Sequence, residues 1–206
     1  GFQAVMPIRG KILNCLKADY DRIFKSEIIT DLIRVLGCGV QVKTRANKNL
    51  GVFDINNLRW SKVIFCTDAD VDGFQIRVLL LTMVYRLAPA LIEEGKVYIA
   101  ESPLYEITSK EETYFAYNEQ EKAEFLKKLE GKKYTIQRSK GLGQNEPEMM
   151  SLTTMDPKTR RLIKVNPGDA EEAARMFEIM QGNDLDGRKE YIAEHGNEYT
   201  EELDVS

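Results

Sequence analysis

The sequence contains little histidine and cysteine, which argues against several kinds of catalytic site. Its only histidine, His195, lies in a polar stretch near the end of the chain. We therefore expect neither a histidine-dependent triad nor a zinc site built from several histidines. The three cysteines, Cys15, Cys38 and Cys66, lack the paired spacing of a metal site, and Cys66 falls in a predicted buried strand as a small hydrophobic residue. This cysteine usage favours a reducing, cytoplasmic setting.

Long apolar runs are also missing. No stretch approaches the roughly 20 apolar residues that cross a bilayer. The first residues lack the charge and the apolar run of a secretion signal. Internal repeats and low-complexity segments are absent as well. We therefore expect no membrane association.

The sequence has no excess of positive charge, since its net charge is −4. This argues against a protein coated in positive charge, but local basic patches remain open as nucleic-acid contacts. Four such clusters occur, namely Arg9 and Lys11; Lys43, Arg45 and Lys48; Arg138 and Lys140; and Lys158, Arg160, Arg161 and Lys164. Each cluster alone is more typical of a solvated face than of a binding site.

The most informative segment that is present is VIFCTDADVDG at residues 63–73. Its apolar start predicts a short buried strand, and its aspartates follow at the carboxyl end, where open α/β sheets place ligand sites. Alternate residues of an extended segment face one side, so Asp68, Asp70 and Asp72 are expected to converge. Three close carboxylates repel one another, and a hard divalent cation relieves that repulsion. The same residues are also consistent with an ordinary acidic turn before Gly73.

Two other sites share this aspartate spacing. A calcium-binding EF-hand loop needs a bidentate glutamate at its twelfth position, which is Leu79 here, and a helix rather than a strand before the loop. That interpretation fails twice. An aspartate-nucleophile phosphatase also places Asp-x-Asp after a strand, but it usually has Thr or Val where this sequence has Asp72. The phosphatase remains a weaker alternative.

Helical spacing of apolar residues predicts a helix from Gly73 to about Ile92, with a bend or restart at Pro89. A strand is expected at residues 96–100. Strand, acidic loop, helix and strand make a βαβ unit, whose strands should be parallel.

Further elements are expected on either side of this unit. They are a helix over 28–36 that Gly37 ends, a long loop over 38–58, extended segments at 103–107, 113–117 and 133–137, and a short helix over 119–129. From about Glu146 strand signals vanish. Pro147 suits a helix start, an apolar stripe over 170–180 predicts a helix, and Tyr191 and Ile192 belong to another.

Separated motifs now stand in one order. They are PIRGKILN at 7–14, TDADVDG at 67–73, SKGLG at 139–143 and TTMDP at 153–157. From Phe2 to about Ile192 the chain resembles the B subunit of bacterial type II DNA topoisomerases, meaning gyrase B or the topoisomerase IV counterpart of gyrase B. The resemblance implies an α/β fold. It implies a TOPRIM (Rossmann-like) domain with a central, mostly parallel sheet over 1–145, lacking its first strand and glutamate motif. A helical C-terminal tail over 146–206 would follow.

The resemblance also implies a site and its partners. Asp68 and Asp70 match magnesium ligands, with Asp72 in a supporting role and Mn²⁺ or Ca²⁺ as alternative ions. Positions that match or lie near DNA contacts are Arg9, Lys11, Asn14, Gln75, Lys140 and Arg188. The implied partners are double-stranded DNA and an A subunit (gyrase A or topoisomerase IV A) in an A2B2 assembly in the bacterial cytoplasm, at the nucleoid. A tyrosine of the A subunit attacks a DNA phosphate, and an upstream domain of the B subunit hydrolyses ATP.

The sequence departs from this family pattern in several places. The catalytic glutamate of the family, in a Glu-Gly-Asp-Ser-Ala motif, lies upstream of residue 1, so we expect this chain to be inactive alone and to bind Mg²⁺ weakly or not at all. The usual histidine after the acidic loop is Gln75, and a frequent glutamate is Gln144. Residues 107–138 leave no room for the large insertion of some gyrases.

Two alternatives remain. A stand-alone Mg²⁺-dependent TOPRIM nuclease or primase-like enzyme needs its own glutamate near the aspartates. Glu101 and Glu106 follow a neighbouring strand, but no spacing argument brings either to the site. In a purely structural interaction domain, the aspartates would only cap the following helix.

Overall fold

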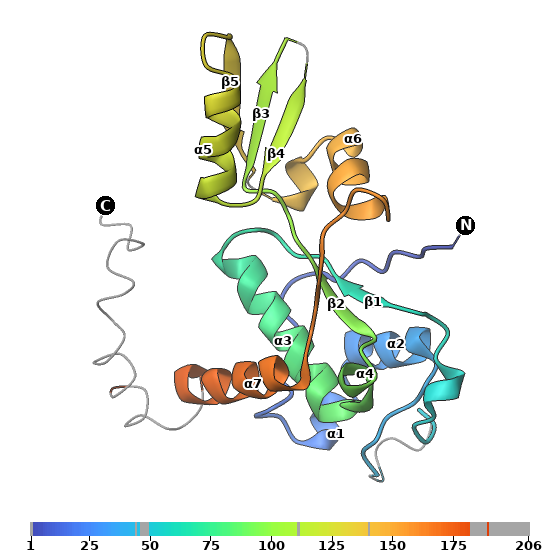
Figure 1. Ribbon diagram of the computed structural model, residues 1–206. Coiled ribbons are helices and arrows are strands. Elements are labelled where there is room, and N and C mark those ends of the chain that lie inside the picture. Colours follow the sequence, from blue (N-terminus) through green and yellow to red (C-terminus); the bar gives the residue numbers. More distant parts are fainter. Residues whose placement is uncertain are drawn as a thin grey trace.

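The chain was analysed as a computed structural model that describes residues 2–43, 45, 50–110, 112–139, 141–181 and 189 (Figure 1). Its main sheet has the strand order β1 (Val63–Phe65), β2 (Val97–Ala100) and β6 (Leu162–Lys164). β1 and β2 are parallel, and β2 and β6 are antiparallel. The connection between the parallel strands is helical, so the predicted βαβ unit is confirmed.

The connecting helix of this unit is broken in two, as the sequence predicts. α3 spans Val71–Leu87 and α4 spans Ala90–Glu93, with Pro89 at the start of the second helix. Proline has no N–H to donate and restricts the residue before it, so a continuous helix is disfavoured there. α3 and α4 both pack against α7 (Pro167–Gln181), which covers them from the C-terminal part of the chain.

Two helices precede the sheet. α1 spans Tyr20–Ile23, which the sequence did not predict, and α2 spans Glu27–Leu36. α2 ends at Gly37, whose φ of 82° lies in the left-handed region that favours glycine. The predicted loop over 38–58 is also present, with an isolated bridge between Val40 and Val52 and a 3₁₀ turn, η2, at Ile55–Asn57.

A second, smaller sheet forms a unit of its own, which we call the small unit (residues 104–138). Its strands are antiparallel in the order β4 (Thr113–Ala116), β3 (Tyr105–Ser109) and β5 (Tyr134–Arg138). α5 (Glu119–Lys128) lies against β4, and the two elements share a core of Ile107, Ala116 and Leu129. Figure 1 shows this unit standing apart from the main sheet, joined to it by the segment after β2 and by the chain that returns to β6.

The α/β fold class is confirmed, but the sheets are more mixed than the predicted mostly parallel arrangement. Among the described strands only β1 and β2 pair in parallel. The β3–β4 connection is a short turn, which permits only antiparallel pairing. β6 enters the main sheet from the far side of the small unit and runs against β2.

The C-terminal part is not purely helical, which corrects the expectation for residues 146–206. α6 (Pro147–Met150) begins at Pro147 as predicted and continues into a π-helical turn, η4 (Ser151–Met155). β6 then joins the main sheet before α7 begins. The stripe at Tyr191 and Ile192 lies outside the described residues.

The main core lies between α2, α3 and the sheet. Its most deeply buried large side chains include Ile23, Ile29, Leu87 and Leu91. Cys15 and Cys38 are buried in it as free thiols, and Cys66 is half-buried. No helix among the described residues is both long and apolar enough to cross a membrane.

Candidate functional site

The acidic loop, Thr67–Gly73, leaves the carboxyl end of β1 and runs into α3, where the sequence predicted it. Asp70 is the N-cap of α3, and its Oδ1 accepts a hydrogen bond from the Gly73 N–H at 2.8 Å. Gly73 packs directly on the loop, because a Cβ there would lie 2.0 Å from the carbonyl oxygen of Asp68. The first turn of α3 therefore tolerates only glycine at this position.

Asp68 is held by the second family motif, the SKGLG segment. Its Oδ1 accepts a hydrogen bond from the Leu142 N–H at 2.7 Å, although the two residues are 74 positions apart. Gly141 lies beside the same carboxylate, and a Cβ there would be 3.4 Å from Asp68 Oδ2. Leu142 begins a 3₁₀ turn, η3 (Leu142–Gln144), so a backbone N–H at the start of a helical turn faces the carboxylate.

Asp72 is held by the first motif. Its Oδ1 lies 2.9 Å from Lys11 Nζ, with the two side chains 75% and 48% exposed. An ion pair this open to solvent contributes at most about 1 kcal/mol. The pair therefore identifies which side chains meet more than it stabilises the fold.

The three aspartates do not converge, and this corrects the expectation drawn from an extended segment. Asp72 is the second residue of α3, so the two-residue alternation of a strand does not apply to it. Within the described part of the chain, no three Asp, Glu, His or Cys side chains gather closely enough to hold a metal ion. Carboxylates are the donors that Mg²⁺ prefers, but Asp68 and Asp70 alone are an incomplete set. Both acids remain predicted ligands.

Sequence reasoning missed the residues behind the acidic loop. Thr67 is only 5% exposed, and its hydroxyl accepts hydrogen bonds from Arg77 of α3. Ser102 donates to the Thr67 carbonyl at 3.3 Å. Burial raises the pKa of the Cys66 thiol and Asp68 adds to the rise, while Arg77 and a hydrogen bond with Thr154 oppose it. A buried polar residue next to an acidic motif is the only signal that could have identified Thr67.

Thr154 belongs to the TTMDP motif, so all the separated motifs contact β1 or the acidic loop. This motif is also tied to the start of the chain. Gln3 Nε2 donates to the Met155 carbonyl at 3.0 Å, and Arg160 Nη1 donates to Gln3 Oε1 at 2.8 Å. These contacts hold the segment that leads to Lys11 against the C-terminal part.

The other predicted DNA contacts have different surroundings. Arg9 is exposed, and Gln75 is half-buried on α3. Asn14 caps a turn, since its Oδ1 accepts from the backbone N–H groups of Leu16 at 2.9 Å and Lys17 at 3.3 Å. That contact gives Asn14 a structural role. The predicted contacts Lys140 and Arg188 lie outside the described residues.

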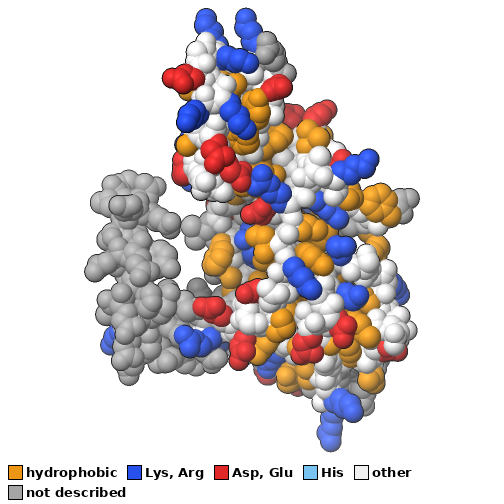
Figure 2. Space-filling model, viewed as in Figure 1, with side chains coloured by type: hydrophobic (Ala, Val, Ile, Leu, Met, Phe, Trp, Pro, Cys, Tyr) orange, Lys and Arg blue, Asp and Glu red, His pale blue; other side chains and the backbone are white. Residues whose placement is uncertain are grey.

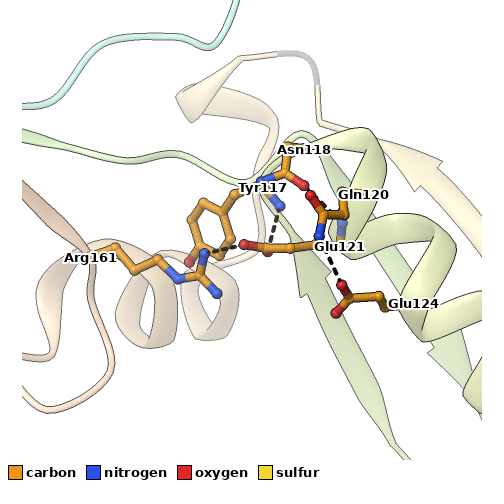
Figure 3. A network of polar contacts seen from close by, with 6 residues as sticks. All are labelled: Tyr117, Asn118, Gln120, Glu121, Glu124 and Arg161. Atoms are coloured by element: carbon orange, nitrogen blue, oxygen red, sulfur yellow. Dashed lines mark hydrogen bonds and ion pairs between the residues drawn. The ribbon is translucent and has the colours of Figure 1, made fainter.

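A polar network fastens the small unit beside the site (Figure 3). Arg161, just before β6, donates to Glu121 of α5 at 2.6 Å and stacks on Tyr117, with its Cζ 3.9 Å from the ring centroid. This hydrogen bond is the largest cause that lowers the pKa of Glu121. Glu121 also accepts from the Tyr117 N–H at 3.1 Å, and its own N–H donates to the N-cap Asn118 at 2.8 Å. The Arg161 carbonyl in turn accepts from the Glu101 N–H at 3.0 Å, so one residue joins both units.

The end of β5 borders a cavity of about 420 Å³. Its lining residues are Glu106, Gln137, Arg138, Ser139, Asn145, Glu146 and Met149. Glu106 therefore lies in the small sheet, and neither Glu106 nor Glu101 belongs to a metal-binding group with the aspartates among the described residues. On the face seen in Figure 2, basic and acidic side chains are interspersed, so nucleic-acid contacts there must be local.

Two family models match the chain. The Toprim domain matches residues 1–102, and the carboxyl terminus of the DNA gyrase B subunit matches residues 131–193. Most of the small unit, residues 103–130, falls between the two matches.

Curated relatives match almost the whole chain. The DNA gyrase B subunit of Thermotoga maritima is 48% identical over 204 residues, which are 99% of this chain and 30% of that protein. The gyrase B subunits of Thermus thermophilus and Metamycoplasma hominis are 43% and 40% identical, over 99% and 98% of this chain. The chain spans about 30% of the length of these relatives. It therefore belongs to the family of B subunits of type II DNA topoisomerases, of which it carries the Toprim domain and the carboxyl-terminal part of gyrase B.

Proposed function

We propose that this chain is the DNA-binding and Mg²⁺-binding part of an ATP-dependent type II DNA topoisomerase. The observation that carries the proposal is the meeting of the motifs at the acidic loop and β1. Lys11 pairs with Asp72, the Leu142 N–H binds Asp68, and Thr154 contacts Cys66. Cations, carboxylates and a backbone donor from distant segments are thus concentrated at the carboxyl end of one strand, where α/β folds place their ligands.

The proposed reaction is the cleavage and religation of DNA by a tyrosine of the A subunit. Lys11 and Arg9 would hold DNA phosphates, which fixes the position of the backbone without reading its sequence. Lys11 would then exchange Asp72 for a phosphate, and because both side chains are exposed the exchange costs little.

The metal site is proposed to be shared with residues outside this chain. A bound Mg²⁺ would offset negative charge that builds on the phosphate. Asp68 and Asp70 would supply part of its ligands, and each already accepts a hydrogen bond that fixes its direction. The resemblance assigns a further carboxylate to the family's glutamate motif.

The remaining functions are assigned to other parts of the assembly. The relatives are about three times as long as this chain, and we propose that ATP hydrolysis belongs to the part that the chain does not match. Strand passage would need the A subunit in an A2B2 assembly on double-stranded DNA, in the bacterial cytoplasm.

The test uses the full-length B subunit with its A subunit. Asp68→Asn and Asp70→Asn remove the charge while keeping the oxygen that accepts from Leu142 and the N-cap of α3. We expect each to lower DNA cleavage about 100-fold or more. ATP hydrolysis and thermal unfolding should stay near wild type. Asp31→Asn, at an exposed aspartate of α2, is the matched control. Normal cleavage by both site variants would refute the assignment.

A further inference from the structure

Thr67 is the point at which the acidic loop is anchored to the rest of the fold. Its hydroxyl oxygen accepts from two nitrogens of Arg77, Nη2 at 3.2 Å and Nε at 3.4 Å. Its carbonyl oxygen accepts from the Ser102 hydroxyl at 3.3 Å. Thr67 immediately precedes Asp68, so these contacts set the direction in which the chain leaves β1 toward the first carboxylate.

The Arg77 side chain is unusual for a structural residue. It is half-buried on α3, and burial lowers the pKa of its guanidinium. Among the described residues it forms no ion pair, and its hydrogen-bond acceptor is the neutral Thr67 hydroxyl. Withdrawing a cation from water without an acid partner is costly, and an apolar side chain would pack there at lower cost. The retained charge therefore calls for an explanation beyond packing.

α3 joins the acidic loop at two places through different chemistry. At its N-terminus the Asp70 carboxylate caps the helix, and two turns later Arg77 reaches back to Thr67. The loop between these points carries Asp68. With both ends fixed to one helix, the carboxylates of Asp68 and Asp70 keep a constant relation to each other and to the Leu142 N–H.

We propose that Arg77 is a positioning residue for the cleavage reaction, which holds the Asp68–Asp70 segment in its active geometry through Thr67. The inference rests on the proposed function. The planar fork of arginine allows two of its nitrogens to share one acceptor, whereas the single ammonium of a lysine cannot make the same pair of contacts. Catalytic groups that shift by about 1 Å lose roughly 100-fold in rate, so the effect of losing this anchor should be large.

The experiment compares Arg77→Gln, Thr67→Val, their double variant and Thr67→Ser in the full-length B subunit with its A subunit. We expect Arg77→Gln and Thr67→Val each to lower the rate of DNA cleavage roughly 10- to 100-fold. The double variant should match either single one, because both remove the same interaction. Thr67→Ser keeps the hydroxyl and should recover most of the rate that Thr67→Val loses. DNA affinity and ATP hydrolysis should change by less than about twofold.

The matched control is Arg86→Gln on the same helix. Arg86 donates to the carbonyl oxygens of Cys15 and Ala18, away from the acidic loop. It should lower the thermal unfolding temperature without lowering the cleavage rate of the folded protein. If Arg86→Gln and Arg77→Gln reduce cleavage equally at a temperature where both are folded, the role of Arg77 is structural and the proposal falls.

Asp68→Asn separates this inference from the proposed function. If Asp68→Asn cleaves normally, the proposed function fails and the inference fails with it. If Asp68→Asn is inactive while Arg77→Gln and Thr67→Val cleave like wild type, only the role of Arg77 is refuted. Additive losses in the double variant would also refute it, because they would mean that the two residues act separately.

Discussion

The three aspartates of the acidic loop are evenly spaced, yet each has a different partner. Asp68 accepts from a distant backbone N–H, Asp70 caps a helix, and Asp72 pairs with a lysine. Asp70 serves local structure and the proposed chemistry at the same time, since a capping carboxylate keeps a second oxygen and its charge. The structural interpretation of this residue and the functional one are therefore compatible. Substitutions that keep the cap are needed to separate them.

The Lys11–Asp72 pair yields a prediction about DNA binding. Lys11→Gln should weaken binding of duplex DNA and reduce the slope of log K against log salt by about 1, because one phosphate contact is lost. Asp72→Asn should strengthen binding at low salt, because it removes a negative charge beside that contact. Fluorescence anisotropy over a salt series measures both effects. The exposed Arg34–Asp31 pair of α2 provides controls of the same chemistry, Arg34→Gln and Asp31→Asn. An unchanged salt slope in Lys11→Gln would remove Lys11 from the interface.

At the scale of elements, α3 organises the site because it carries the cap, the anchor Arg77 and the glycine on which the loop rests. Gly73 is helical, so its importance comes from contact rather than from an unusual φ. The backbone of Asp68 occupies the space that any side chain would need. Helix and loop can therefore move only together, which suits a site in which carboxylates must keep a fixed geometry.

Gly73→Ala tests this close contact. A methyl group 2.0 Å from a carbonyl oxygen forces the loop away from the helix, and we expect a loss of about 1–3 kcal/mol in the free energy of unfolding, together with loss of cleavage. Gly168→Ala is the matched control, because Gly168 lies in α7 with nothing within 4 Å of the added Cβ. There alanine should leave stability unchanged or raise it by up to about 1 kcal/mol. Urea unfolding of the three proteins measures the difference, and equal stabilities would disprove the contact.

At the scale of the whole molecule, the sequence could predict what local patterns determine. The βαβ unit, the break at Pro89 and the end of α2 at Gly37 follow from hydrophobic period, a missing N–H and a left-handed residue. β6 could not be predicted, because a strand of three residues is defined by the β2 edge that it joins. The convergence of the aspartates was wrong because the helix begins one residue after Asp70. Thr67 and Arg77 were missed because only the fold brings a loop and a later helical turn together.

The incomplete set of carboxylates leads to a prediction for this chain by itself. With supercoiled DNA and Mg²⁺, the chain alone should neither relax nor nick the DNA, because Asp68 and Asp70 are too few ligands for a complete centre and no glutamate joins them among the described residues. Agarose gels over a range of Mg²⁺ concentrations test this, with the full-length B subunit, the A subunit and ATP as the positive control. Asp68→Asn in the isolated chain distinguishes a real activity from contamination. Nicking that this substitution abolishes would favour the stand-alone nuclease, since a self-sufficient enzyme must hold its metal with its own residues. Nicking that persists in Asp68→Asn would not come from this site.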